Sequence, residues 1–428
     1  MNTFKKLFIG SIALIAVYFG LIIVFQSGLI GSSARKIDGI EEKGISFEEL
    51  TIPEDIKVVG IGEATHGNSE FQTAKLLMLQ KQVETGLCRS IAFEMTPGEA
   101  AEINDAIHDP DSDLEELVGK TNYPIYDTEQ MLELYTWMRD YNMDKTYEES
   151  IMFYGVDMQG PDREIAYLSG FAEEHPDIID ESEKTQIDEI IASTQNYDYS
   201  SVDASRDFFE GLAERLLSEN DFDSKYVGIL TNSIVQWIDA PSFEERPNDY
   251  GEHRDLCMAN NLKSEYDLEV ERGYSQIIIT AHSGHVMKGS ALSYGETAMG
   301  AQIDKIFEGS YFVVGTEFYN ATVNIHTAGT YDEEYERKDH DYCSEDILAY
   351  QAKYFDGDCY CLDFTKLTEE DGKVYSLVHK PNFMGMAGEG WSVYMDFNKT
   401  YHTKLIQADR FDAVIYYYNV TPIRTLHN

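Results

Sequence analysis

Glu63 and His66 stand in one short motif, GEATHG, at residues 62–67. A carboxylate beside an imidazole fixes which ring nitrogen carries the proton, so the other nitrogen can take a proton from water near neutral pH. This pairing predicts general-base chemistry, such as the activation of water for hydrolysis. We expect the glycines at positions 60, 62 and 67 to let the backbone turn sharply and a substrate come close.

Three further ionisable residues follow apolar runs elsewhere in the chain. Glu94 lies in the run SIAFEM at residues 90–95, and His282 and His285 follow QIIITA at residues 276–281. The carboxyl ends of parallel strands meet at one edge of a sheet, where α/β proteins bind ligands. The sequence therefore predicts that Glu94 and the two histidines join Glu63 and His66 in one catalytic site.

Two more residues could bind substrate or an oxyanion at this edge. Asp157 ends the run IMFYGVD at residues 151–157, and Arg254 begins a helical stretch. A guanidinium there could stabilise a tetrahedral oxyanion or grip an anionic group. The alternative for Arg254 is a salt bridge with Asp255 or Glu252.

The same residue types leave a metal-dependent mechanism open. A divalent metal such as Zn²⁺ accepts imidazole and carboxylate ligands, although activation of water by a histidine requires no cofactor. The chain has no HExxH, GxSxG, P-loop or dinucleotide motif, and Ser283 lies in an ordinary turn. The candidate metal ligands are His66, Glu94, His282 and His285.

Apolar runs alternate with helical patterns, which predicts an α/β fold with a central, mostly parallel sheet flanked by helices. The runs lack polar alternation, as expected for strands covered on both faces. Helical patterns span residues 69–83 and 161–172, and another begins at Pro97. Besides the three runs above, strands are predicted at residues 57–62, 311–318 and 412–418.

Two regions depart from this alternation. Residues 180–272 are acidic with apolar positions at helical spacing, which predicts a helical insertion or cap. Residues 331–371 are polar and rich in tyrosine, and they show no clear period.

The N-terminal segment predicts membrane attachment. Lys5 and Lys6 precede the uncharged residues 7–25, a stretch long enough to span a bilayer. Residues 1–27 are predicted to be a transmembrane helix, or a signal segment if cleaved near the small residues 32–34. The positive-inside rule places the rest outside the cytoplasm, as a single-pass membrane protein or a secreted one. Residues 28–44 are expected to form a linker before a domain at 45–428.

The charge balance excludes nucleic acid as a partner. The chain has 77 acidic and 33 basic residues, a formal charge of −44, and such a surface repels polyphosphates. We expect most of these acids to be solvated.

Five scattered cysteines do not form a disulfide scaffold. Cys343 could bridge to Cys359 or Cys361 in the polar region. Cys88 and Cys257 lie in apolar patterns read as helical, and we expect them to be buried thiols.

The run GIGEATHGNSEFQTAK at residues 60–75 resembles the signature of the erythromycin esterase family. The resemblance continues, in the family's order, through IAFE at Glu94, GVDMQG at Asp157, HRDLCMANNL from His253, TAHSGHV at His282 and RFDAVIYY from Arg410. These motifs extend over most of the chain.

The resemblance implies hydrolysis of a lactone or another ester by water. His66 would be the base, while Glu63, Glu94, His282 and His285 would position that base, the water and the substrate. Lys75 stands where macrolide esterases have an arginine. A lysine keeps the positive charge but lacks the planar guanidinium group. We expect Lys75, with Arg254 and Asp157, to bind substrate or an oxyanion.

The family also includes relatives similar to succinoglycan-biosynthesis proteins, so an acylated glycan joins small-molecule esters and lactones as a candidate substrate. Three functions follow: an anchored, outward-facing esterase, a metal-dependent hydrolase of a cell-surface substrate, and a surface protein that binds a ligand without turning it over.

Overall fold

A large mixed sheet forms the centre of the computed structural model, which describes residues 14–15, 17–20, 35–194, 198–289, 297–327, 336–393, 395 and 399–427. Its first six strands run parallel, and the seventh is antiparallel to its neighbour. In spatial order these strands are β3 (Met152–Gly155), β2 (Cys88–Phe93), β4 (Gln276–His282), β1 (Val58–Glu63), β5 (Tyr311–Thr327), β11 (Ala413–Val420) and β7 (Cys359–Asp363).

Helices cover both faces of this sheet, as predicted. Successive residues of β1 point to opposite faces, so Val58 joins the core beneath α12 (Pro247–Arg272) and α14 (Met299–Ile306). Val59 joins the core beneath α3 (Ser69–Glu84) and α6 (Glu129–Asn142). The strand is buried throughout, which explains why its sequence is apolar without alternation.

The sheet extends further than predicted. Beyond residue 318, β5 continues and pairs with β6 (Arg337–Cys343) and β9 (Gly390–Trp391). A separate pair joins β8 (Asn382–Gly385) to β10 (His402–Leu405). Strand β6 reads RKDHDYC, and its polar side chains are largely exposed. A strand of this composition carries no hydrophobic period, so the sequence did not reveal it.

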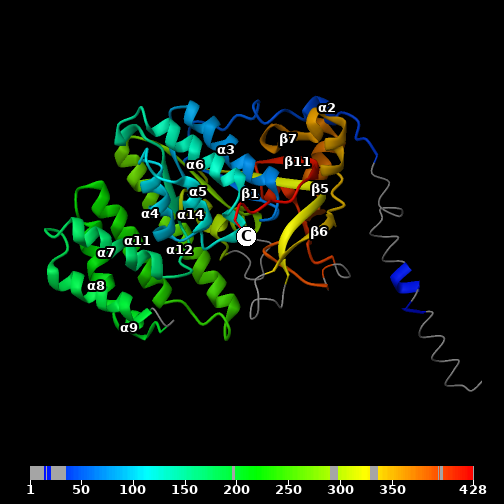
Figure 1. Cartoon of the computed structure of the whole chain (residues 1–428). Helices are drawn as coiled ribbons and strands as arrows, with labels where there is room; N and C mark the ends of the chain where they lie inside the picture. The colour runs from blue at the N-terminus through cyan, green and yellow to red at the C-terminus, as the bar shows by residue number, and fades with distance from the viewer. Residues whose placement is uncertain are drawn as a thin grey trace, which may run out of the picture.

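A helical layer lies at one end of the molecule (Figure 1). It has its own apolar core and contains α7 (Asp162–Glu174), α8 (Glu181–Thr194), α9 (Ser200–Ala204), α10 (Arg206–Leu217) and α11 (Phe222–Ile238). The layer begins before the predicted boundary at residue 180. Helix α12 returns from it to the sheet, starts with a proline and ends at Gly273 in the left-handed conformation.

The remaining helices flank these elements. Helix α4 (Pro97–Ala106) packs between β3 and α7, and α5 (Leu114–Gly119) packs on α6. Two short helices, α13 (Ser283–Val286) and α15 (Lys373–Val378), follow β4 and β7 along the chain.

Part of the predicted linker is folded. Ile37 and Ile40 are buried in the main core, and the Ile37 amide donates to Gln351 Oε1 at 2.8 Å. Ile40 begins α2 (Ile40–Lys43). The domain therefore starts before residue 45, because these two apolar side chains complete its core.

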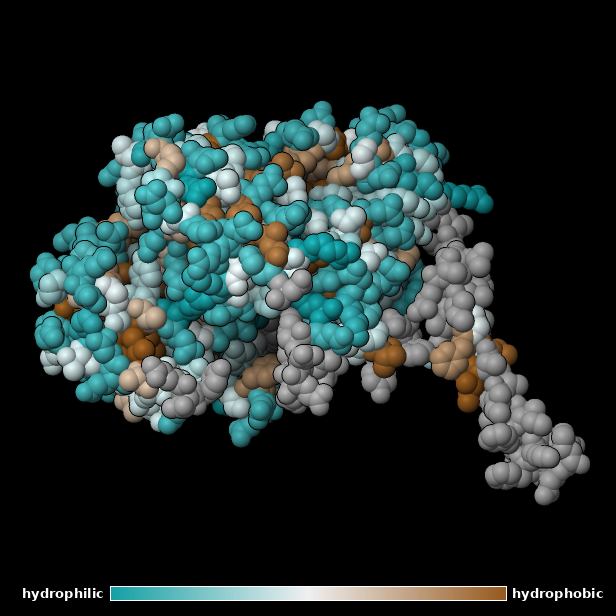
Figure 2. Space-filling view, in the orientation of Figure 1, coloured by the Kyte–Doolittle hydropathy of each residue, from teal (hydrophilic) through white to brown (hydrophobic). Residues whose placement is uncertain are grey.

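Most of the apolar segment 7–25 lies outside the described residues. Among the helices that are described, none combines the length and apolar character needed to cross a bilayer. The N-terminal anchor stays a prediction. The molecular face in Figure 2 is mostly hydrophilic, with small apolar areas between polar side chains.

The possible disulfide from Cys343 to Cys359 or Cys361 does not form, since all five cysteines are free. Cys343 lies on β6, whereas Cys359 and Cys361 lie on β7, and β5 and β11 separate these strands. Three strand spacings amount to about 14 Å, far beyond the reach of a disulfide. Cys88 is buried as predicted but begins strand β2 rather than lying in a helix, while Cys257 is buried on α12.

Candidate active site

The carboxyl edge of the parallel strands brings the predicted residues together. Glu63 ends β1 and pairs in register with His282, which ends β4. Glu94 directly follows β2, the strand on the other side of β4. All but Glu63 of the five central residues line a cavity of about 590 Å³, whose lining is His66, Glu94, Tyr123, Ile125, Gln159, Arg254, His282, Gly284, His285, Met386, Gly388, Glu389 and Thr403.

Glu63 holds the ring of His66 from behind, with 2.7 Å between Glu63 Oε1 and His66 Nδ1. Burial alone would raise the pKa of Glu63, but the Lys75 charge and the His66 hydrogen bond outweigh it and lower the pKa to about 2. Since an ionised carboxylate can only accept, Nδ1 is the donor. The unprotonated nitrogen of a neutral His66 is therefore Nε2, which suits a general base.

Lys75 lies behind this pair and is absent from the cavity lining. Its Nζ is 2.9 Å from Glu63 Oε2, and its side chain is 1% exposed. The ammonium also lies 5.2 Å and 5.0 Å from the ring centres of Phe93 and Tyr126. The predicted contact of Lys75 with substrate is thus wrong in this structure, because helix α3 directs the side chain to the far oxygen of Glu63.

Arg254 joins two carboxylates that follow different strands. Its Nη2 donates to Glu94 Oε1 at 2.6 Å and to Asp157 Oδ2 at 2.7 Å, and its Nε donates to Asp157 Oδ1 at 2.9 Å. The alternative pairing with Asp255 or Glu252 is wrong. Asp157 is fully buried, so it orients Arg254 instead of contacting substrate.

His285 lies between two acids. Its Nδ1 is 2.7 Å from Asp255 Oδ1, and its Nε2 is 3.5 Å from Glu94 Oε1. Burial acts to lower the pKa of His285, but the charges of Glu94 and Asp255 outweigh it and raise the pKa. Burial also acts to raise the pKa of Glu94, and the charges of His285 and Arg254 lower it well below its usual range.

Asp255 is the residue that sequence reasoning missed. It is fully buried on α12, and its Oδ2 also accepts the Met299 amide at 2.9 Å. The only signal in the sequence is its place beside Arg254 in the HRD triplet.

His282 stays neutral between the other two histidines. Burial, with the neighbouring His66 and His285, lowers the pKa of His282 to about 3. Its Nδ1 accepts the Gly284 amide at 3.2 Å, so the proton of the neutral ring lies on Nε2. That buried Nε2 has no hydrogen-bond partner among the described residues, and the ring centre is 5.1 Å from that of His66.

A sequence model described as erythromycin esterase matches residues 83–420 of this chain. The chain belongs to the erythromycin esterase family. The predicted resemblance to this family is confirmed. The matched range begins after the His66 loop. The fold brings that loop to the same sheet edge as Glu94, His282 and His285, which lie inside the matched range.

One relative is the erythromycin esterase type II of Escherichia coli. It is 32% identical over 104 residues, which span 24% of this chain and 24% of that relative. The similarity thus reaches only about a quarter of the relative's length.

Three solved structures share the fold of this family member. A Bacillus cereus protein has a TM-score of 0.68 at 18% identity, covering 90% of this chain and 97% of its own. A succinoglycan biosynthesis protein has a TM-score of 0.70 at 16% identity with the same coverage. A mutant erythromycin esterase in its open conformation has a TM-score of 0.61 at 16% identity, covering 91% and 96%.

The glycines of the His66 loop serve packing. None of Gly60, Gly62 and Gly67 has a positive φ. A Cβ at Gly67 would lie 2.1 Å from the Asn324 carbonyl oxygen, and one at Gly62 would lie 2.6 Å from Val286. The expectation of a sharp turn and close substrate approach is wrong for these positions, because the missing side chains face other protein atoms.

Segments distant in sequence hold this loop of the esterase-family site. The Gly67 carbonyl accepts the amides of Asn324 and Ile423 at 3.1 and 3.0 Å. Asn68 Nδ2 donates to the carbonyls of Thr322 and Thr421 at 2.9 and 3.0 Å. The position of His66 therefore depends on β5 and the C-terminal segment.

The four candidate metal ligands are engaged mainly with neighbouring protein groups. Across the described part of the chain, no three or more His, Cys, Asp or Glu side chains are arranged to hold a metal ion.

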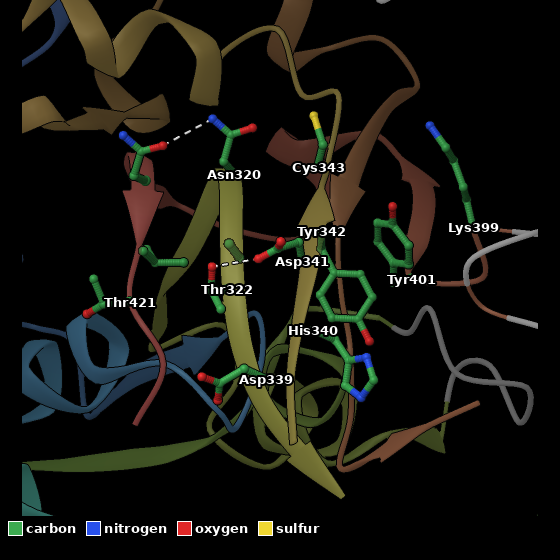
Figure 3. A pocket seen from close by; sticks show the side chains of 13 residues that line it. Asn320, Thr322, Asp339, His340, Asp341, Tyr342, Cys343, Lys399, Tyr401 and Thr421 are labelled. Atoms are coloured by element: carbon green, nitrogen blue, oxygen red, sulfur yellow. Dashed lines mark hydrogen bonds between the residues drawn. The ribbon is translucent and has the colours of Figure 1, made fainter. Parts of the chain in front are cut away.

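A separate hollow of about 690 Å³, away from the strand ends, lies over β5, β6 and β11 (Figure 3). Asn320 donates to Asn419 there at 3.1 Å, and Thr322 donates to Asp341 at 2.7 Å. None of the predicted site residues lines it, so we assign the chemistry to the smaller cavity at the strand ends.

Proposed function

We propose that this protein hydrolyses esters by water that His66 activates. The observation that carries the proposal is the contact between His66 Nδ1 and the buried, ionised Glu63 at the wall of the cavity. This contact orients the imidazole and leaves Nε2 to accept a proton.

The reaction requires only the groups of this site. His66 Nε2 takes a proton from water while the water oxygen bonds to the ester carbonyl carbon. The N–H of neutral His282 is suited to stabilise the oxyanion that develops, because it is a buried donor without a partner among the described residues. Electrostatic stabilisation of this kind is commonly the largest catalytic contribution.

His285 completes the cycle as general acid. Two carboxylates favour its protonated form, and its Nε2 lies beside Glu94 at the cavity. It gives a proton to the departing alcohol oxygen as the carbon–oxygen bond breaks. The first products are the carboxylic acid and the alcohol. The acid then ionises, while protonated His66 and deprotonated His285 exchange their protons with solvent.

The substrate class we propose is a small-molecule ester or lactone, with acylated glycans as a further class. Family membership supports ester hydrolysis. We also propose a membrane-anchored domain facing outward, which rests on Lys5, Lys6 and the uncharged residues 7–25.

The test is hydrolysis by purified full-length protein of aryl esters, macrolide lactones and acetylated oligosaccharides, beside His66→Ala. We expect the variant to lose activity by about 10² to 10⁴-fold, the usual contribution of a general base. His379→Ala, which removes an exposed histidine directly after α15, is the control. Retained activity in His66→Ala would remove His66 from the mechanism, and loss of activity on chelation would favour a metal-dependent hydrolase.

A further inference from the structure

A second cavity lies directly behind one wall of the active site. It measures about 700 Å³ and includes Thr121, Pro124 and Asp127 in its lining. Tyr123 and Ile125, from the same short segment, line the active-site cavity. Residues 121–127 are therefore a thin partition with space on both sides, and the 3₁₀ turn at Pro124–Tyr126 is its middle.

Helix α3 holds the partition from one side. Gln72 Nε2 donates to the Ile125 carbonyl at 2.5 Å, and Thr128 Oγ1 donates to Gln72 Oε1 at 2.6 Å. These bonds hold the middle of the segment and the residue that directly follows it.

The C-terminal segment holds the other side of the partition through Asp127. The Leu426 amide donates to the Asp127 carbonyl at 3.0 Å. The His427 amide lies 3.1 Å from Asp127 Oδ2, and His427 Nδ1 lies 2.8 Å from Asp127 Oδ1. Asp127 thus receives three contacts from two residues and anchors this end of the partition, while Glu99 on α4 accepts hydrogen bonds from Thr121 and Asn122 at the other end.

The same segment binds the loop that carries His66. Ile423 donates to the Gly67 carbonyl, and the Ser69 amide donates to the Thr421 carbonyl, both at 3.0 Å. Residues 421–427 therefore connect the catalytic base to the cavity wall. A change in this segment can alter the wall at Asp127 while the contacts at residues 421–423 keep the loop in place.

The second cavity has a polar, partly cationic lining. Arg337, Arg424, His427 and Asn324 contribute to it, in a chain whose formal charge is −44. Arg337 is also ion-paired with Glu389, which lines the active-site cavity. Such a lining suits a hydroxyl-rich group more than an apolar one.

We propose that residues 121–127 are a latched partition, that the Asp127–His427 contact is the latch, and that the cavity behind accepts the hydroxyl-rich part of a bulky ester. The inference rests on the proposed ester hydrolysis. With the latch closed, the enzyme favours small esters; with the latch open, the wall moves back and the two cavities form one cleft.

The test compares Asp127→Asn and His427→Ala in the full chain by hydrogen exchange and by acetate release. Exchange of amides 121–128 should rise in both variants. The KM for a mono-acetylated trisaccharide should fall by about threefold to tenfold, the worth of a typical hydrogen bond, while kinetics with 4-nitrophenyl acetate stay unchanged. Two variants guard against one that fails to fold, and thermal unfolding checks both.

Asp339→Asn is the matched control, because it removes the ion pair of Arg424 on the same segment without touching Asp127. Unchanged exchange in the latch variants would overturn the proposal, and so would an equal rise in the control, which indicates general loosening. Raised exchange with unchanged KM would separate the second cavity from the substrate site. If the unaltered protein released no acetate from either ester, the proposed function would fail. Hydrogen exchange would still test whether the Asp127–His427 contact holds the partition.

Discussion

The site contains two histidine–carboxylate pairs that are alike in distance and different in surroundings. Glu63 and Asp255 each lie 2.7 Å from the Nδ1 of their histidine. Behind Glu63 stands Lys75, which neutralises that carboxylate, whereas His285 faces a second acid, Glu94. One pair is thus charge-compensated by a lysine, and the other places an imidazole between two negative charges.

This difference teaches how one residue type can take opposite roles. The Glu63–His66 pair fixes a tautomer, so its Nε2 can accept a proton. The acids around His285 raise its pKa, so its Nε2 can give one. In the proposed mechanism, the neighbouring charges and not the histidines themselves decide which ring acts as base and which as acid.

The largest expected effect comes from breaking the first pair with Glu63→Gln. The amide no longer forces the proton onto Nδ1, so kcat/KM should fall by up to about 10⁴-fold, as when the orienting acid of other triads is lost. Steady-state kinetics on an aryl ester measures this. A fall of less than tenfold would show that Glu63 does not set the tautomer.

Lys75→Met tests whether the lysine acts through charge. It leaves the buried Glu63 carboxylate without its counter-ion, so the free energy of unfolding should fall by about 3 kcal/mol. Chemical denaturation measures this change. The double variant Glu63→Gln/Lys75→Met should recover most of the loss, and no recovery would assign the loss to packing.

Asp255→Asn tests the second pair, with an expected fall in kcat of about tenfold at neutral pH. His285 loses the charge that raises its pKa, so the alkaline limb of the pH–rate profile should move to lower pH. Asp255 is here a positioning residue. An unchanged limb with lower activity would indicate a purely structural role.

The smallest effect concerns stability against pH. A histidine whose folded pKa is raised adds stability that is complete below its unfolded pKa of about 6.5 and is lost as pH rises through the folded value. The unfolding midpoint of the unaltered protein should therefore lose more between pH 6 and pH 9 than that of Asp255→Asn, by roughly a few degrees. Thermal unfolding of both proteins across this pH range measures the difference. An identical change of unfolding midpoint with pH in the two proteins would contradict the prediction.

Much of the site followed from local patterns. Apolar runs without alternation predicted buried parallel strands, and the carboxyl ends of such strands must share an edge. These patterns correctly place Glu63, Glu94 and His282 at that edge. The polar strand β6 and the start of the domain at Ile37 were missed, because exposed polar strands and single apolar anchors carry no period.

By itself the sequence determined the residue types at the strand ends and the family signature, on which the proposed class of reaction rests. Only the tertiary structure decided the partners: Asp255 for His285, Lys75 behind Glu63, and residues 421–423 around the His66 loop. The physical reason is how far apart in the sequence the interacting residues lie. Strand ends are set by local hydrophobic pattern, whereas the charge next to a buried histidine comes from helices and tails remote in the chain.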